Sequence, residues 1–97
     1  MMTDIINNTE KQQFEIHLDD AIAYLTYRFY KKDIALMHTF VPDAFKGKGF
    51  GSALAAFAFD YARQEKKPVM VYCPFVGKYV KDHPEVRELL DQEFHRR

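Results

Sequence analysis

Three of the four glycines in this 97-residue chain stand at alternate positions, Gly47, Gly49 and Gly51, in one short loop. Glycine has no Cβ and can adopt a positive φ, so such a loop can turn successive backbone N–H groups to the same side. An apolar run that ends at Pro42 precedes the loop, and a helical pattern follows Ser52. A strand, a glycine loop and a helix in this order predict an anion-binding cradle at the helix start. A simple glycine-rich turn is the alternative.

Three segments before the loop have the patterns of β-strands. Residues 14–18 alternate apolar and polar side chains, residues 21–30 present two different faces, and residues 34–41 are almost entirely apolar or aromatic. The connections between them are too short for a crossover, so we expect an antiparallel meander whose third strand is covered on both faces. Residues 1–12 are polar, and we expect them to be irregular.

The segments after the loop alternate helix and strand. After Ser52 comes an amphipathic helix that ends before Pro68, and residues 69–73 form a short β-branched run. A strand, a helix and a strand in sequence imply a right-handed crossover, so the third and fourth strands should be parallel. Two short helices should follow, after Pro74 and from Pro84 to about Phe94. The sequence predicts one α+β domain over residues 1–97, with a mostly antiparallel sheet and one parallel βαβ unit that carries the glycine loop.

Charge and cysteine content exclude several functional classes. Fourteen basic residues balance fourteen acidic ones, so the chain lacks the overall charge of a nucleic-acid-binding protein. The single cysteine, Cys73, excludes an intrachain disulfide and favours a reducing compartment. Without a signal-peptide pattern or a run of about 20 apolar residues, we expect a cytoplasmic protein with no membrane partner. The four histidines have no metal-ligand spacing, so no metal site is expected, and the oligomeric state stays open.

The loop suits a diphosphate but fits neither of two common nucleotide-binding motifs. Lys46 and Lys48 add positive charge at its mouth. A Walker loop needs a glycine, four residues and then Gly-Lys-Ser or Gly-Lys-Thr, which this chain lacks. The dinucleotide fingerprint needs its third glycine three positions after the second, whereas the spacing here is Gly47-x-Gly49-x-Gly51.

Residues 46–54, Lys-Gly-Lys-Gly-Phe-Gly-Ser-Ala-Leu, resemble the pyrophosphate-binding motif of the Gcn5-related N-acetyltransferases (GNAT), Gln/Arg-x-x-Gly-x-Gly/Ala. Together with residues 38–42 (His-Thr-Phe-Val-Pro) and 73–76 (Cys-Pro-Phe-Val), the loop is similar to the minimal members of that superfamily, the YjdJ-type or NATD1-like family. The resemblance covers about residues 14–85. Lys46 stands where the superfamily prefers Gln or Arg. A lysine keeps the positive charge of arginine but lacks the planar, forked guanidinium group. The N-terminal helices of full-sized relatives are also absent.

The resemblance implies acetyl-coenzyme A (acetyl-CoA) as the ligand and an amine as its partner in the reaction. The pantetheine arm would pair with the end of the third strand, and the diphosphate would lie on the loop amides. The residues that the resemblance assigns to this ligand are Thr39, Val41, Lys46, Gly47, Lys48, Gly49, Phe50, Gly51 and Ser52. The acetyl group would point between the third and fourth strands where they separate, near His38 and Cys73.

Acetyl transfer to an amine needs groups that accept and donate protons. The strands leading to the expected site contain no Glu, the commonest general base of the superfamily, so His38, Cys73 and Tyr79 are the catalytic candidates. An imidazole titrates near neutral pH, and Tyr79 stands where larger relatives place a tyrosine that protonates the thiolate. Each also has a structural alternative: a core histidine, a buried cysteine and a core aromatic. Lys78 and Lys81 either reach the adenosine phosphate or are solvated charges.

The sequence therefore predicts an acetyl-CoA-dependent N-acyltransferase that acts on a small amine or an exposed lysine. The alternative is a non-catalytic acyl-CoA-binding or sensing module that keeps the loop but lacks the general base and the floor of the acceptor pocket. A third possibility is an interaction domain that uses its aromatic surface. The missing strand Glu favours the binding module, whereas the positions of His38 and Cys73 favour an enzyme.

Overall fold

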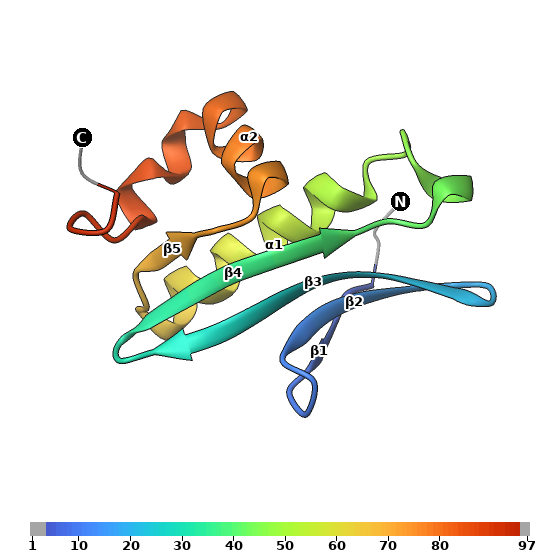
Figure 1. Ribbon diagram of the computed structural model, residues 1–97, viewed down its shortest axis with the longest axis horizontal. Helices are drawn as coiled ribbons and strands as arrows, with labels where there is room; N and C mark the ends of the chain where they lie inside the picture. Colours follow the sequence, from blue (N-terminus) through green and yellow to red (C-terminus); the bar gives the residue numbers. More distant parts are fainter. Residues whose placement is uncertain (1–3, 96–97) are drawn as a thin grey trace.

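The computed structural model describes residues 4–95, which form a five-stranded sheet in the order β1-β2-β3-β4-β5 (Figure 1). The first four strands are antiparallel to their neighbours, and β4 and β5 are parallel. The fold prediction, an α+β domain with one parallel βαβ unit, is confirmed. The strands are β1 (Ile6–Asn8), β2 (Gln13–Leu18), β3 (Ala21–Tyr30), β4 (Asp33–Phe40) and β5 (Val69–Val71).

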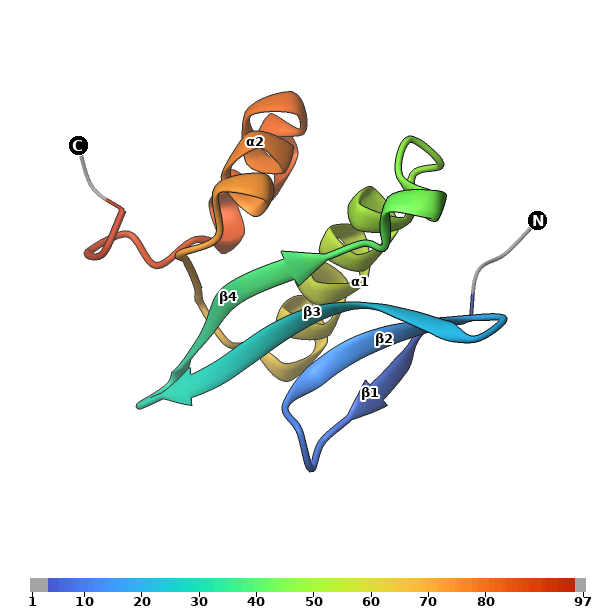
Figure 2. The same ribbon diagram turned by 45° about the vertical axis from the view of Figure 1, so that its right-hand side comes forward.

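One face of the sheet carries the main helix. Helix α1 (Phe50–Glu65) connects β4 to β5 and lies behind β3 and β4 in Figure 1, whereas no described helix covers the opposite face (Figure 2). Helix α2 (Pro74–Asp82) and the 3-10 helix η2 (Pro84–Leu89) follow β5, and a short 3-10 helix, η1 (Asp43–Phe45), follows β4. Over residues 4–95, no helix combines the length and hydropathy needed to cross a bilayer.

The hydrophobic core lies between the sheet and the helices. Phe14 of β2 is fully buried and stacks on Tyr27 of β3, with ring centroids 4.7 Å apart. From α1, Phe57 and Tyr61 meet the same Phe14 ring edge-on, at 5.3 and 5.4 Å. The apolar stripe that the sequence predicts on this helix therefore does face the sheet. Such aromatic pairs contribute about 0.5–1.5 kcal/mol beyond their buried area.

Strand β1 lies within residues 1–12, which the sequence predicts to be irregular. Its three residues pair with β2, in a register that sets Ile6 opposite Glu15 and Asn8 opposite Gln13. So short an edge strand leaves no periodic apolar pattern, and its pairing is provided by the adjacent strand. The prediction is thus wrong for residues 6–8, and residues 1–3 lie outside the described part of the chain.

The C-terminal segment also differs from expectation, because the expected helix around residues 86–94 stops early. Only η2 forms, with Val86 buried against the core. Leu90 is extended and forms a parallel bridge with Val69, and the Asp91 N–H donates to the Val69 carbonyl at 2.8 Å. The free edge of β5 takes these residues because unpaired strand N–H and C=O groups need partners.

Candidate functional site

Strands β4 and β5 pair over only three positions and then separate. Their last paired residues are Leu36 and Val71. The Leu36 carbonyl also accepts hydrogen bonds from the N–H groups of Tyr72 and Cys73, at 3.0 and 3.2 Å. Strand β4 continues to Phe40, so its edge beyond Leu36 has no strand partner on that side within residues 4–95. The expected separation of the two parallel strands is present.

A β-bulge interrupts β4 at the beginning of this separation. Tyr27 of β3 pairs with Leu36, but the preceding residue, Thr26, pairs with His38, which makes Met37 an extra residue. An extra residue shifts the alternation of side chains between the two faces by one position. After the bulge, His38 therefore lies on the face opposite to that of Leu36, and the next residue lies on the helix-bearing face.

The bulge determines which predicted residues meet. Thr39 pairs with the buried Leu25 and faces the helices, where its Oγ1 lies 3.3 Å from the Sγ of Cys73. His38 is exposed on the other face. The structure thus brings Thr39 to Cys73 and does not bring His38 there. Regular alternation gives the opposite arrangement, so the sequence pattern alone does not reveal this contact.

The three loop glycines are needed for two different reasons. Gly47 and Gly49 have φ values of 80° and 86°, and a Cβ on either would meet no atom within 4 Å. Their role is conformational, because other residues rarely adopt this region. Gly51 has no positive φ, but a Cβ there would lie 2.7 Å from Cζ of Phe75. Positive φ therefore explains the first two glycines, and close packing explains the third.

Helix α1 begins at Phe50, earlier than the sequence pattern indicates. Gly49 is its N-cap and makes no side-chain capping bond. The first amide to bond back along the helix is that of Ala53, which donates to the Gly49 carbonyl at 3.0 Å. The N–H groups of Phe50, Gly51 and Ser52 consequently have no acceptor within the helix. Together they make a local positive potential, equivalent to roughly half an elementary charge.

A cavity of about 570 Å³ lies against these amides. All the residues predicted to bind the ligand line it except Lys48, and the walls are completed by the rings of Phe40, Phe45 and Phe75. The Lys46 ammonium pairs with the Asp43 carboxylate at 3.2 Å, but both side chains are largely exposed. Such a pair contributes little and is easily exchanged for a ligand.

Cys73 links the wall of the glycine-loop cavity to the wall of a second cavity. Its side chain is buried, and its residue precedes α2, whose Gly77 N–H donates to the Cys73 carbonyl at 3.0 Å. Cys73 lines a second cavity of about 720 Å³, whereas its hydrogen-bond partner Thr39 lines the glycine-loop cavity. The hydrogen bond between the two side chains therefore joins the walls of both cavities.

Tyr79 is packed within the helical layer. Its ring stacks on Phe59 at 6.0 Å and on His83 at 4.0 Å. Burial raises the pKa of the Tyr79 hydroxyl, and the nearby charges of Glu85 and Asp60 raise it further. Among the described residues, Tyr79 is not part of the wall of either of the two larger cavities. This position matches the core-aromatic alternative.

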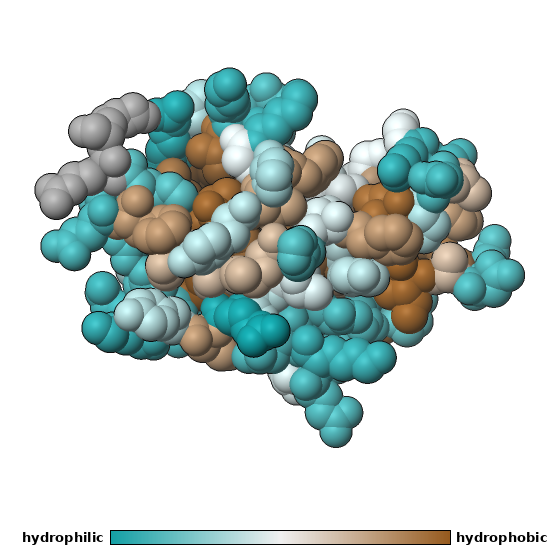
Figure 3. All heavy atoms as spheres, viewed as in Figure 1, coloured by the Kyte–Doolittle hydropathy of each residue, from teal (hydrophilic) through white to brown (hydrophobic). Residues whose placement is uncertain are grey.

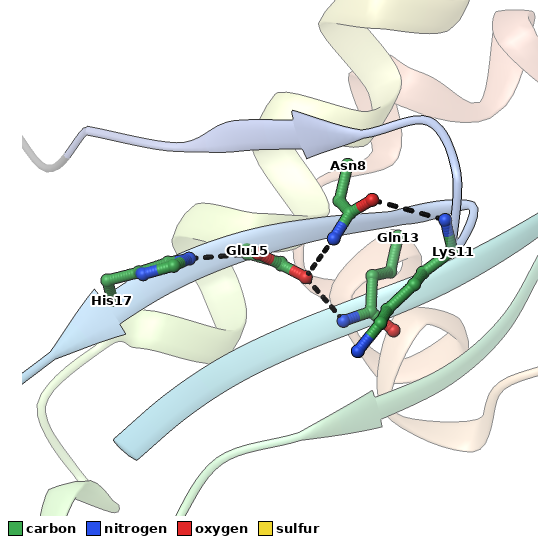
Figure 4. Close-up of polar contacts among 5 residues, drawn as sticks. All are labelled: Asn8, Lys11, Gln13, Glu15 and His17. Carbon is green, nitrogen blue, oxygen red and sulfur yellow. Dashed lines mark hydrogen bonds and ion pairs between the residues drawn. The ribbon is translucent and has the colours of Figure 1, made fainter. Parts of the chain in front are cut away.

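Glu15, on β2, is buried, although the alternating pattern of residues 14–18 places it on the polar face of the strand. Its carboxylate accepts hydrogen bonds from Asn8 and Gln13, at 2.9 and 2.6 Å, and lies 2.9 Å from Nε2 of His17 (Figure 4). Burial alone would raise the pKa of this carboxyl, but the three hydrogen bonds bring it below its ordinary value. Glu15 lines neither of the two larger cavities, and its bond to Asn8 joins β1 to β2.

No group of three His, Cys, Asp or Glu side chains within residues 4–95 is arranged to hold a metal ion.

Comparison with known proteins identifies the family. The sequence model of the GCN5-related N-acetyltransferases matches residues 13–89. Protein NATD1 from Xenopus tropicalis is 36% identical over 81 residues, covering 80% of this chain and 74% of the relative. Protein NATD1 from Mus musculus is 35% identical over the same length and shares. A GCN5-like protein from Staphylococcus aureus, solved by NMR, superposes with a TM-score of 0.72 at 25% identity, covering 98% of this chain and 97% of its own. The chain belongs to the GCN5-related N-acetyltransferase family.

Proposed function

We propose that this protein transfers the acetyl group of acetyl-CoA to an amine. The observation that carries the proposal is the row of free N–H groups from Phe50 to Ser52, which lies against a cavity that extends to Thr39. Backbone donors at a helix start favour a diphosphate, and the unpaired edge of β4 offers backbone partners to a pantetheine arm. In this pose the thioester lies near the Thr39–Cys73 hydrogen bond.

The reaction needs little more than positioning and proton transfer. The neutral amine nitrogen attacks the thioester carbonyl and forms the new C–N bond. The C–S bond then breaks, the nitrogen gives up one proton, and the coenzyme leaves as a thiolate that takes up a proton. Of the three catalytic candidates, Cys73 fits this site best, because His38 faces the open side of the sheet and Tyr79 is stacked on Phe59. The Cys73 thiol either relays a proton or accepts the acetyl group as a thioester before the amine does. Proximity supplies much of the acceleration.

Calorimetry with acetyl-CoA tests the binding step. We expect Gly49→Ala to weaken the affinity by about tenfold or more, since a Cβ at positive φ costs about 1–2 kcal/mol and displaces the loop amides. Gly77→Ala is the matched control, because Gly77 has no positive φ and no atom lies within 4 Å of its added Cβ. A folded Gly49→Ala protein that binds like the wild type would show that the loop is not the ligand site.

Release of free thiol from acetyl-CoA, measured over a panel of amines, tests the chemical step. We expect Cys73→Ala to reduce turnover by about tenfold or more while the affinity for acetyl-CoA stays the same. Mass spectrometry of the wild type after incubation with acetyl-CoA should find an added acetyl group on Cys73 if the route is covalent. Unchanged turnover in Cys73→Ala would assign this residue to packing.

A non-catalytic acyl-CoA-binding module is the second candidate. It is favoured by the outward-facing His38 and by the absence of a carboxylate among the described residues that line the glycine-loop cavity. The two candidates differ in one measurement. An enzyme releases thiol with at least one amine, whereas a binding module holds acetyl-CoA tightly and releases none with any of them.

A further inference from the structure

The second cavity, of about 720 Å³, has the size of a small-molecule site. It lies between the end of β5, helix α2 and the C-terminal segment, and its apolar walls include Val71, Val80 and Leu90. Figure 3 shows apolar atoms between the hydrophilic side chains of α2 and those of the C-terminal segment. An apolar wall with a few polar groups at its rim is the usual composition of a ligand site.

The charges of this cavity have one sign. Lys81 of α2 and Arg87 of η2 line it, and no Asp or Glu does so among the described residues. Within residues 4–95, no carboxylate lies within ion-pair distance of either cation, whereas Lys78 on the same helix pairs with Asp82 at 3.0 Å. Two unneutralised cations at the rim of a partly apolar cavity favour an anionic ligand.

His95 supports the wall of the cavity without adding charge. The backbone N–H of Val71 donates to Nε2 of His95 at 2.9 Å, so this nitrogen carries no proton and the ring is neutral. Burial lowers the pKa of His95, although the Asp91 charge opposes this. The bond fastens the C-terminal segment to β5, and the positive charge of the cavity therefore comes from Lys81 and Arg87.

We infer that this cavity binds the acceptor and that the acceptor is a small amine that also carries a carboxylate or phosphate. The anionic group would be held by Lys81 and Arg87, and the amine would point to Cys73. Because the thiol bonds to Thr39, which lines the other cavity, an amine at this end lies next to the thioester of the proposed function, on which this inference rests. An exposed protein lysine lacks the anionic group that these two cations select.

The test compares β-alanine with β-alaninamide, which share one framework and one amine and differ only in the carboxylate. Each is titrated into the ¹⁵N-labelled full chain and followed by NMR. We expect β-alanine to shift the amide signals of Cys73, Gly77 and Leu90, and to bind about tenfold more tightly than its amide. Arg87→Gln and Lys81→Gln should each remove most of this preference. Lys78→Gln is the matched control and should keep it.

Equal affinities for β-alanine and β-alaninamide, or shifts confined to the glycine loop, would overturn the inference. A Lys78→Gln loss as large as that of Arg87→Gln would also overturn it, because the preference would then reflect overall charge. Acetyl-CoA is titrated separately and read at Gly47 and Gly49. Acetyl-CoA binding without a β-alanine preference leaves the proposed function standing and rejects this inference. The reverse result supports an anion-binding cavity and rejects the proposed function.

Discussion

Gly49 and Gly51 stand two positions apart, and each is a glycine for its own reason. Gly49 has a φ of 86°, whereas Gly51 lies in the first turn of α1 against the ring of Phe75. An added Cβ at Gly51 would lie 2.7 Å from that ring. Phe75 is 41% exposed and lies outside the hydrophobic core, so its ring can be removed without opening a core cavity. The first glycine shapes the loop, and the second sets the distance between the starts of α1 and α2.

We therefore expect a second substitution, Phe75→Ala, to restore part of the acetyl-CoA affinity that Gly51→Ala loses, and not the affinity that Gly49→Ala loses. Gly51→Ala should cost about 1–3 kcal/mol, as overpacking does, and lower acetyl-CoA affinity by displacing the first turn of α1. Adding Phe75→Ala should recover part of the affinity, because it removes the clashing ring. Thermal melts and calorimetry on the four proteins of this double-mutant cycle measure the coupling. The same Phe75→Ala change should not rescue Gly49→Ala, and additivity of Gly51→Ala with Phe75→Ala would contradict the packing explanation.

Strand β1 shows how a short element is held by side chains more than by its own pattern. Three residues of β1 pair with β2, and the buried Glu15 carboxylate collects hydrogen bonds from Asn8 on β1 and from Gln13 on β2. His17, also on β2, lies beside the same carboxylate. A buried carboxylate without these partners would be costly, so the network and the burial depend on each other.

The lowered pKa of Glu15 predicts acid sensitivity of this hairpin. Because the folded pKa lies below the unfolded one, the stabilisation is present above the unfolded value and is lost as the pH falls through the folded value. Glu15→Gln should lose about 1–3 kcal/mol at neutral pH, and its stability should fall less steeply between neutral pH and acid. Urea unfolding across this range measures both effects. Hydrogen exchange should also quicken first at Asn7 and Asn8, and an unchanged pH slope would contradict the role of the network.

At the scale of the whole molecule, two aspartates join the middle of the chain to its C-terminal segment. Asp33 begins β4 and is buried, and its Oδ1 has no hydrogen-bond partner within residues 4–95. Burial raises the pKa of Asp33, and the hydrogen bond to Asp91 and the charge of Asp91 raise it further. The same bond lowers the pKa of Asp91. Asp33 is therefore the more readily protonated member of the pair that joins the start of β4 to the C-terminal segment.

Asp33 and Glu15 have opposite effects on how the stability of the protein changes with pH. Because its folded pKa lies above the unfolded one, its stabilisation is complete below the unfolded value and is lost as the pH rises through the folded value. Asp33→Asn keeps a donor for Asp91 and cannot ionise. We expect this variant to be more stable than the wild type at neutral pH, and to lose its advantage in acid. Urea unfolding at both pH values tests this, and a variant that is less stable at neutral pH would contradict it.

Patterns within a few neighbouring residues were enough to predict most of the helices and strands and the glycine loop. The alternation in residues 14–18 and the apolar stripe of α1 indicate which apolar side chains face the core. The glycine spacing indicates a backbone conformation that few other residues adopt. The family resemblance and the α+β fold followed from these. The same patterns were wrong for β1, which is held by its neighbour, and for residues 90–94, where Leu90 and Asp91 bond to Val69 of β5 and the helix does not continue.

The sequence by itself thus determined the class of fold, the position of the glycine loop and the helix behind it, because these depend on neighbours within a few positions of the chain. The tertiary structure alone decided which side chains meet in the site. The bulge at Met37 turns Thr39 toward Cys73 and His38 away from it, and the positions of α2 and η2 after β5 bring Lys81 and Arg87 to one cavity. These contacts join residues that are far apart in sequence, and a one-residue change of register reverses a strand's faces without any signal in its composition.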